Sequence, residues 1–250
     1  MTGILYLIPN TLGPADPDAG TPLHHVIPEE VQAITARLDY FVAENAKTTR
    51  AFLKTVALVR PLARPLQEIR IAELNVNTDA SALPALLQPL LDGLDAGLIS
   101  EAGVPAVADP GANLVRLAHA RGIRVRPLVG PSSLLLAVMA SGLNGQSFAF
   151  NGYLPTDAAL RQKRIRELED RSRRDRQTQL FIETPYRNAA LLEALAATCH
   201  PATLISVATD LTLVAESIRT QAASHWKRDV SEGRLPDFHK KPTVFSLLAE

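Results

Sequence analysis

Short apolar runs alternate with longer segments of helical periodicity, and this alternation constrains the fold more than any other feature of the chain. The apolar runs predict strands at Ile4–Ile8, Tyr40–Ala43, 97–100, 123–129, Phe148–Tyr153, 179–182, 203–208 and Thr243–Leu248. The segments between them predict helices at 28–38, 48–59, 81–91, 113–120, 132–140, 157–174, 188–197 and 224–231. Strands that alternate with helices of about ten residues indicate βαβ units. We therefore expect an α/β protein.

A glycine and proline pair interrupts this alternation at Gly130-Pro131. The chain of 250 residues is long enough for two small domains with separate cores. We place the first α/β domain at residues 1–128, with a parallel sheet. The second half repeats the alternation less cleanly, and we place there, at residues 129–250, an α/β domain with a mixed sheet.

Composition narrows the class of protein. The formal net charge is zero, so binding to nucleic acid would need a local basic patch. The single cysteine, Cys199, excludes an intrachain disulfide framework and fits a reducing compartment. The first apolar run has no basic leader or cleavage site, and no stretch approaches the roughly 20 apolar residues of a membrane span. We expect a cytoplasmic protein.

Several familiar catalytic signatures are absent from the sequence. No G-x-G-x-x-G follows the first strand, and there is neither a phosphate-binding G-x-x-x-x-G-K-S/T loop nor a G-x-S-x-G nucleophile elbow. The six histidines lack metal-ligand spacing, and one cysteine cannot build a thiolate zinc site. We expect no metal.

Loops rich in Gly, Pro and small residues remain as candidates. Residues 100–105 (SEAGVP) and 108–111 (ADPG) follow a strand, and residues 130–133 (GPSS) open a helix. Small residues let the backbone approach a ligand closely, and ligands of parallel sheets bind beyond the carboxyl ends of the strands. The same loops are equally compatible with structural turns.

Taken in order, these segments resemble the tetrapyrrole methylase superfamily. The resemblance rests on SEAGVPAVADPG (100–111), VGPSS (129–133) with ASGL (140–143), FNGYLP (150–155), FIETPYR (181–187) and VATDLTLVAES (207–217). It begins more weakly at LYLIPNTLG (5–13) and AENAK (43–47). Within the superfamily the chain is most similar to the branch that methylates a ribose 2′-hydroxyl in bacterial small-subunit ribosomal RNA.

The resemblance implies a class III methyltransferase of two α/β domains, usually a homodimer, with S-adenosylmethionine in an interdomain cleft. By position, the residues that it implies for cofactor binding are Pro9, Gly103, Val104, Pro105, Ser132, Ser133, Thr184, Ala208, Pro242 and Thr243. Most contacts of the family to this cofactor run through backbone groups, which suits the small residues found here.

The acceptor side departs from the pattern of the RNA-modifying branch. That branch usually has Glu-Asp-Thr-Arg where this chain has ENAK (44–47), and Arg-Glu-Leu-Thr-Lys where it has TDLTL (209–213). It commonly has a His where this chain has Leu74 before Asn75, and its first loop is Pro-Ile-Gly-Asn where this chain has PNTLG (9–13). These departures leave the identity of the acceptor open.

Carboxylates that follow predicted strands are candidates for a base that assists attack by a ribose hydroxyl. They are Glu44, Glu101, Glu183 and Asp210, each of which could instead cap a helix or pair with a cation. For substrate binding, Tyr186 could stack on a base and Arg187 could bind phosphate, or Arg187 could simply neutralise Glu183.

Residues 161–176 carry eight basic and four acidic side chains, so this segment either contacts ribosomal RNA or is a solvated helix face. Three functions stay open. They are methylation of a ribosomal ribose, methylation of a tetrapyrrole or another small acceptor, and a non-catalytic binding module that keeps the fold.

Overall fold

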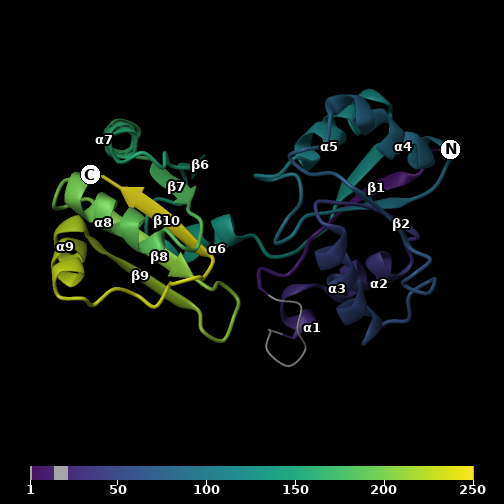
Figure 1. Ribbon diagram of the computed structural model, residues 1–250, viewed down its shortest axis with the longest axis horizontal. Coiled ribbons are helices and arrows are strands. Elements are labelled where there is room, and N and C mark those ends of the chain that lie inside the picture. The colour runs from purple at the N-terminus through teal and green to yellow at the C-terminus, as the bar shows by residue number, and fades with distance from the viewer. Residues whose placement is uncertain (1, 14–21, 250) are drawn as a thin grey trace. The chain divides into compact units, whose positions relative to one another are not determined.

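The chain forms two units, each with its own five-stranded sheet, in a computed structural model that describes residues 2–13 and 22–249 (Figure 1). The first unit is Met1–Ser132 and the second is Ser133–Glu250. The division thus lies between residues 132 and 133, whereas the sequence pattern places it between 128 and 129.

The sheet of the first unit is wholly parallel, with the strand order β3-β2-β4-β1-β5. Its strands are β1 (Ile4–Ile8), β2 (Tyr40–Ala43), β3 (Arg70–Glu73), β4 (Ala96–Ile99) and β5 (Arg124–Pro127). The helical elements between them are α1 (Leu23–Val26), α2 (Glu29–Ala36), α3 (Ala46–Ala57), the 3-10 turn η1 (Ala80–Ala82), α4 (Leu83–Leu91) and α5 (Gly111–Ala120).

Helices cover both faces of this sheet, with α2 and α3 on one side and α4 and α5 on the other (Figure 1). Successive side chains of a strand point to opposite faces. Accordingly, Phe41 of β2 packs in one buried cluster with Phe52 of α3, and the next residue, Val42, packs in another with Leu114 of α5. Burial on both faces explains why the central strands are continuous apolar runs.

The second unit has a mixed sheet with the strand order β6-β7-β10-β8-β9, in which only β6 and β7 are parallel. Its strands are β6 (Phe148–Tyr153), β7 (Thr178–Ile182), β8 (Leu204–Thr209), β9 (Ser217–Ala222) and β10 (Thr243–Leu248). Its helices are α6 (Ser133–Ser141), α7 (Ala158–Asp175), α8 (Asn188–Thr198) and α9 (Ala223–Ser231).

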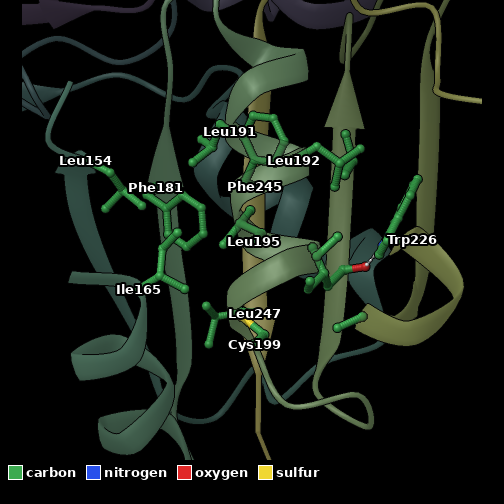
Figure 2. Close-up of a cluster of buried hydrophobic side chains, with 14 of the residues drawn as sticks. Leu154, Ile165, Phe181, Leu191, Leu192, Leu195, Cys199, Trp226, Phe245 and Leu247 are labelled. Carbon is green, nitrogen blue, oxygen red and sulfur yellow. Dashed lines mark hydrogen bonds between the residues drawn. The ribbon is translucent and has the colours of Figure 1, made fainter. Parts of the chain in front are cut away.

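The core of the second unit lies between the sheet and helices α7, α8 and α9 (Figure 2). The rings of Phe181 on β7 and Phe245 on β10 stack with centroids 6.2 Å apart. Trp226 of α9 is fully buried and donates its indole N–H to the carbonyl oxygen of Ile205 at 2.9 Å. The only tryptophan of the chain therefore reports on the packing of this unit.

The α/β fold expected from the sequence is confirmed, with differences at the ends of elements. Helix α3 begins at Ala46 rather than at residue 48, because the Asn45 side chain caps it and accepts from the amide of Lys47 at 2.9 Å. The helical segment expected at 81–91 begins one residue earlier, as a 3-10 turn at Ala80, because the Asp79 carboxylate caps it and accepts from the amide of Ser81 at 2.7 Å. Strands β3 and β9 were not expected. No helix among the described residues is long and apolar enough to cross a membrane.

A buried carboxylate on α9 gives the second unit a specific sensitivity to acid. Asp229 accepts from Gln221 and Arg234, each at 2.8 Å, and also pairs with Arg219. These hydrogen bonds and cations lower the pKa of Asp229 to about 2. A carboxyl whose pKa is lower in the folded than in the unfolded chain adds stability above its unfolded pKa, and that stability is lost as the pH falls through the folded pKa.

We therefore expect the second unit to lose stability between roughly pH 4 and pH 2, in a step that Asp229→Asn removes. Denaturant titrations at a series of pH values, followed by the fluorescence of Trp226, measure this. An identical pH dependence in the wild type and in Asp229→Asn would contradict the assignment.

Candidate functional site

The carboxyl ends of β1 and β4 are tied together by Asn10, the second residue after β1. The Asn10 amide donates to the Gly103 carbonyl oxygen at 2.8 Å in an isolated bridge between the two loops. The Asn10 side-chain amide donates to the carbonyl oxygens of Ser100 at 3.1 Å and Glu101 at 3.0 Å. Asn10 is only 4% exposed, so this buried amide holds the loop after β4 against the end of β1. Sequence reasoning missed it as a site residue.

Two of the predicted carboxylates meet at the same edge. Glu44 follows β2, and its amide donates to the carbonyl oxygen of Ile99 at the end of β4 at 3.1 Å. Its carboxylate accepts from the amide of Glu101 at 3.1 Å. Glu44 is half-buried and Glu101 is exposed. Glu44 thereby fixes the backbone of Glu101, whose own carboxylate faces solvent.

The loop after β4 is held in an unusual conformation. Gly103, Ala106 and Ala108 all have a left-handed backbone, with φ of 68°, 66° and 64°. For a residue with a Cβ this costs about 1–2 kcal/mol, so it persists only where the surroundings determine it. Asp109 supplies that restraint, because its carboxylate accepts from the amides of Ala106 at 2.8 Å and Gly111 at 2.7 Å. Burial, and to a lesser degree the charge of Glu44, raises the pKa of Asp109.

The remaining candidates of the first unit surround this loop. Pro9 is buried and packs directly on Gly130, where an added Cβ would overlap the proline ring. A Cβ on Gly103 would lie 3.4 Å from the carbonyl oxygen of Pro131. Pro105 is buried, and Val104 and Ser132 are half-buried. The first unit thus brings together Pro9, the loop at 103–105 and the segment at 130–132.

In the second unit, Asn188 at the start of α8 ties the segment after β7 to the start of β10 and the segment before it. Its side-chain amide donates to the carbonyl oxygens of Phe238 and Lys241, each at 2.9 Å, and to the hydroxyl of Thr243 at 3.1 Å. The Thr243 hydroxyl lies 3.2 Å from that of Thr209. Asn188 is 1% exposed, and sequence reasoning also missed it.

Other predicted residues of the second unit lie along the same strand ends. Ala208 is buried in β8 and pairs with Val244 of β10. The carbonyl oxygen of Pro242 accepts from the amide of Asp210 at 3.0 Å. Asp210 has a left-handed φ of 52°, and its carboxylate lies 3.5 Å from the ammonium of Lys241. The same ammonium lies 2.9 Å from the carboxylate of Asp237, so one cation serves two carboxylates. Ser133 is half-buried at the first position of α6.

The segment after β7 contains a buried ion pair. Oε1 of Glu183 accepts from Arg187 Nη2 at 2.6 Å and Nε at 3.0 Å, and from the amide of Thr184 at 2.6 Å. The Glu183 side chain is 1% exposed and that of Arg187 is 36% exposed. Arg187 thus neutralises Glu183, one of the two readings drawn from the sequence. Tyr186 stands between them in sequence and is 73% exposed.

Two buried acceptors in this region have no hydrogen-bond partner among the described residues. They are Oε2 of Glu183 and Oδ1 of Asn188. A buried acceptor without a donor is costly, and such atoms are commonly satisfied by a ligand or water. No cluster of His, Cys, Asp and Glu in the described part of the chain could hold a metal ion. The site offers backbone groups, carboxylates and hydroxyls, which suit a small polar ligand and proton transfer.

Comparison with known proteins gives a consistent result. No protein-family profile matches the chain. It is 31% identical to Ribosomal RNA small subunit methyltransferase I of Mesorhizobium japonicum over 222 residues, which is 88% of this chain and 71% of that protein. It is 33% identical to the protein of the same name from Xylella fastidiosa over 187 residues, 75% of this chain and 64% of that protein. The match with the Vibrio cholerae protein of that name is 27% over 264 residues, 94% of this chain and 81% of that protein.

Solved structures show the same fold at lower identity. The superposition on the methyltransferase CobJ includes 100% of this chain and 100% of CobJ, with a TM-score of 0.59 and 18% identity. The superposition on the cobalt precorrin-4 methyltransferase CbiF includes 97% of this chain and 93% of CbiF, with a TM-score of 0.57 and 10% identity. The resemblance to the tetrapyrrole methylases seen in the sequence is confirmed.

Proposed function

The chain belongs to the ribosomal RNA small subunit methyltransferase I family, and from this membership we propose that it transfers a methyl group from S-adenosylmethionine to a ribose 2′-hydroxyl of ribosomal RNA. The observation that carries the proposal is the match to the Mesorhizobium japonicum protein, which includes 88% of this chain. The strained, tightly bonded loop at 100–111 supports it, because strain of this kind gathers at ligand sites.

The residues present fit the proposed cofactor. When bound, S-adenosylmethionine supplies a methyl group on an electrophilic sulfonium. In the first unit we assign its contacts to Pro9, Gly103, Val104, Pro105 and Ser132, and in the second to Ser133, Thr184, Ala208, Pro242 and Thr243. Amino groups of this ligand are donors that match the unpartnered acceptors of Glu183 and Asn188. The backbone carbonyl and amide groups of these loops would orient the ligand through hydrogen bonds, with no need for a charged side chain.

The proton of the ribose hydroxyl needs an acceptor, and the candidate carboxylates differ in how accessible they are to accept it. Glu101 has an exposed carboxylate on a backbone that Glu44 fixes, so we assign the base to Glu101 and the positioning of its loop to Glu44. Asp210 is half of an ion pair with Lys241, and we assign it to the acceptor side. The exposed ring of Tyr186 is suited to stack on a base, with Arg187 beside it.

Ribosomal RNA is the proposed partner, and we accordingly propose a cytoplasmic location. We propose a homodimer, as the resemblance to the superfamily implies. Light scattering would then give twice the 27.0 kDa of one chain.

Transfer of labelled methyl tests the activity. The purified protein is incubated with tritiated S-adenosylmethionine and small ribosomal subunits, and nucleosides are separated after digestion. We expect the label in a 2′-O-methylated nucleoside. Label on tetrapyrroles or other small molecules alone would assign the acceptor to the second function considered from the sequence. Binding of the cofactor with no turnover would support the non-catalytic one.

The loop at Gly103 gives a sharper test of the cofactor site. We expect Gly103→Ala to weaken S-adenosylmethionine binding about tenfold, because its Cβ would lie 3.2 Å from Cδ2 of Leu12, tighter than an ordinary contact, and would displace that side chain within the loop. Gly122→Ala is a matched control in the same unit. Its φ of 67° imposes a similar backbone cost, and nothing lies within 4 Å of the added Cβ. Calorimetry measures both variants, and equal affinities would remove this loop from the site.

A further inference from the structure

Helix α3 carries positive charge on its solvent face and no negative charge at all. Its twelve residues, AKTTRAFLKTVA, contain Lys47, Arg50 and Lys54 and no Asp or Glu. The three cations are exposed, whereas Phe52 and Val56 on the opposite face are buried. Positions three and seven residues apart lie on one face of a helix, so the cations form a continuous row, here called the α3 row (Lys47, Arg50 and Lys54).

The α3 row is also unneutralised. Among the described residues, none of its three side chains takes part in an ion pair or a hydrogen bond. Cations just beyond the helix behave differently, since Arg60 pairs with Glu29 and Arg64 with Asp39 at 2.7 Å. Unpaired, exposed cations have their full charge available for a polyanion.

The row begins at the candidate site. Asn45 caps α3 directly after Glu44, whose carboxylate fixes the loop of Glu101. Lys47 is therefore in the first turn, three residues after Glu44 in the chain, and Arg50 and Lys54 follow at about 4.5 Å and then about 6 Å along the axis. The amides at this end of the helix are already bonded, Ala46 to Oε1 of Glu73 at 3.1 Å and Lys47 to Oδ1 of Asn45 at 2.9 Å, so the side-chain cations supply the positive charge of this surface. Phosphates on one side of an acceptor ribose near Glu101 would meet these cations in sequence.

The basic helix α7 has more cations than α3, but several of them are paired with neighbouring carboxylates. Arg164 pairs with Glu167, Arg173 with Asp170, and Arg174 with Asp175. Arg161 donates to the carbonyl oxygen of Thr156. Acidic side chains are interleaved with the cations, so four of the eight positive charges of residues 161–176 are offset within the segment. Whether its cations are paired therefore indicates the capacity of a helix to bind a polyanion better than the number of its basic residues does.

We propose that the α3 row binds the phosphate backbone of the RNA substrate beside the acceptor ribose. This rests on the proposed function, since it assigns an RNA-binding surface to the same site. Phosphate contacts position a nucleic acid without reading its sequence. The surface would thus hold the acceptor at the carboxylates, and bases elsewhere would supply specificity.

The test compares two triple variants that remove the same charge. The first is Lys47→Gln, Arg50→Gln, Lys54→Gln, and its matched control is Lys163→Gln, Arg166→Gln, Arg171→Gln on α7. All six residues are exposed, and Gln keeps good helix propensity. Binding of a small-subunit ribosomal RNA fragment is measured by fluorescence anisotropy between 50 and about 200 mM salt, and methyl transfer by tritium incorporation.

We expect the α3 variant to reduce the slope of log affinity against log salt by about 2, at roughly 0.7 for each lost contact with single-stranded RNA, and the α7 variant to keep the wild-type slope. Affinity for S-adenosylmethionine, measured by calorimetry, should not change in either. An unchanged slope in the α3 variant would overturn the inference, as would a loss confined to the α7 variant. If the wild type methylates RNA while the slope stays the same, only this inference fails. If the wild type neither binds nor methylates RNA, the proposed function fails as well.

Discussion

Gly130→Ala is expected to lower the free energy of unfolding of the first unit by about 3 kcal/mol, the cost of forcing atoms into a filled site. An added Cβ at this position would overlap the Cβ and Cγ of Pro9. Pro9 cannot move away from the added Cβ without a large energetic cost. Its ring is rigid and directly follows β1, and the next residue, Asn10, is bonded to the loop after β4. Urea denaturation followed by far-UV circular dichroism measures the change.

Gly145→Ala is the control for this prediction. Its backbone is not left-handed, and its added Cβ would lie 3.7 Å from Val138, an ordinary van der Waals distance. We expect no destabilisation there, since replacing Gly where the backbone allows it reduces the entropy of the unfolded chain. If the two variants unfold at the same urea concentration, the contact between Pro9 and Gly130 is not tight.

Arg187→Ala is expected to destabilise the second unit by about 3 kcal/mol, because it leaves the buried carboxylate of Glu183 without its cation. The Glu183 side chain is 1% exposed and cannot turn to solvent, whereas Arg187 is 36% exposed and can. Glu183→Gln should therefore cost less, about 1 kcal/mol, since it leaves only a solvated cation and a neutral amide. Urea denaturation followed by Trp226 fluorescence reports on this unit.

The double variant Glu183→Gln, Arg187→Ala separates charge burial from lost packing. It should be more stable than Arg187→Ala alone, because no uncompensated charge remains, and the difference measures the coupling between the two residues. A double variant that is less stable than either single variant would show that the pair acts through packing and not through charge.

The sequence predicted the central strands best, for a reason visible in the sheets. Strands β1, β2 and β4 are covered on both faces and are continuous apolar runs. Strands β3 (RIAE) and β9 (SIRTQA) are edge strands, and their charged and polar residues hide the pattern. Which polar segment joins the edge of a sheet depends on tertiary packing, so local periodicity could not reveal these two strands.

The candidate site was predictable in its loops but not in the residues that fix them. Small residues and strand ends pointed to the loop at 100–105 and to Glu44. The hydrogen bonds of Asn10 and Asn188 became visible only in the structure, because their partners lie about 90 and about 50 residues away in the chain. Their one advance signal is a polar amide at the boundary of an apolar element, which is too common to identify a site. Asp109 lies in a loop that the sequence singled out, but the two hydrogen bonds that its carboxylate accepts from backbone amides could not be inferred.

The middle of the second sheet is made from its most C-terminal strand, β10, which lies between β7 and β8. During synthesis from the N-terminus, the first unit has all its strands once residue 127 has left the ribosome. The second has two unjoined ribbons, β6 with β7 and β8 with β9, until residues 243–248 arrive to connect them. Nascent chains halted before β10 should thus display two open strand edges, the kind of surface that chaperones bind and that aggregates.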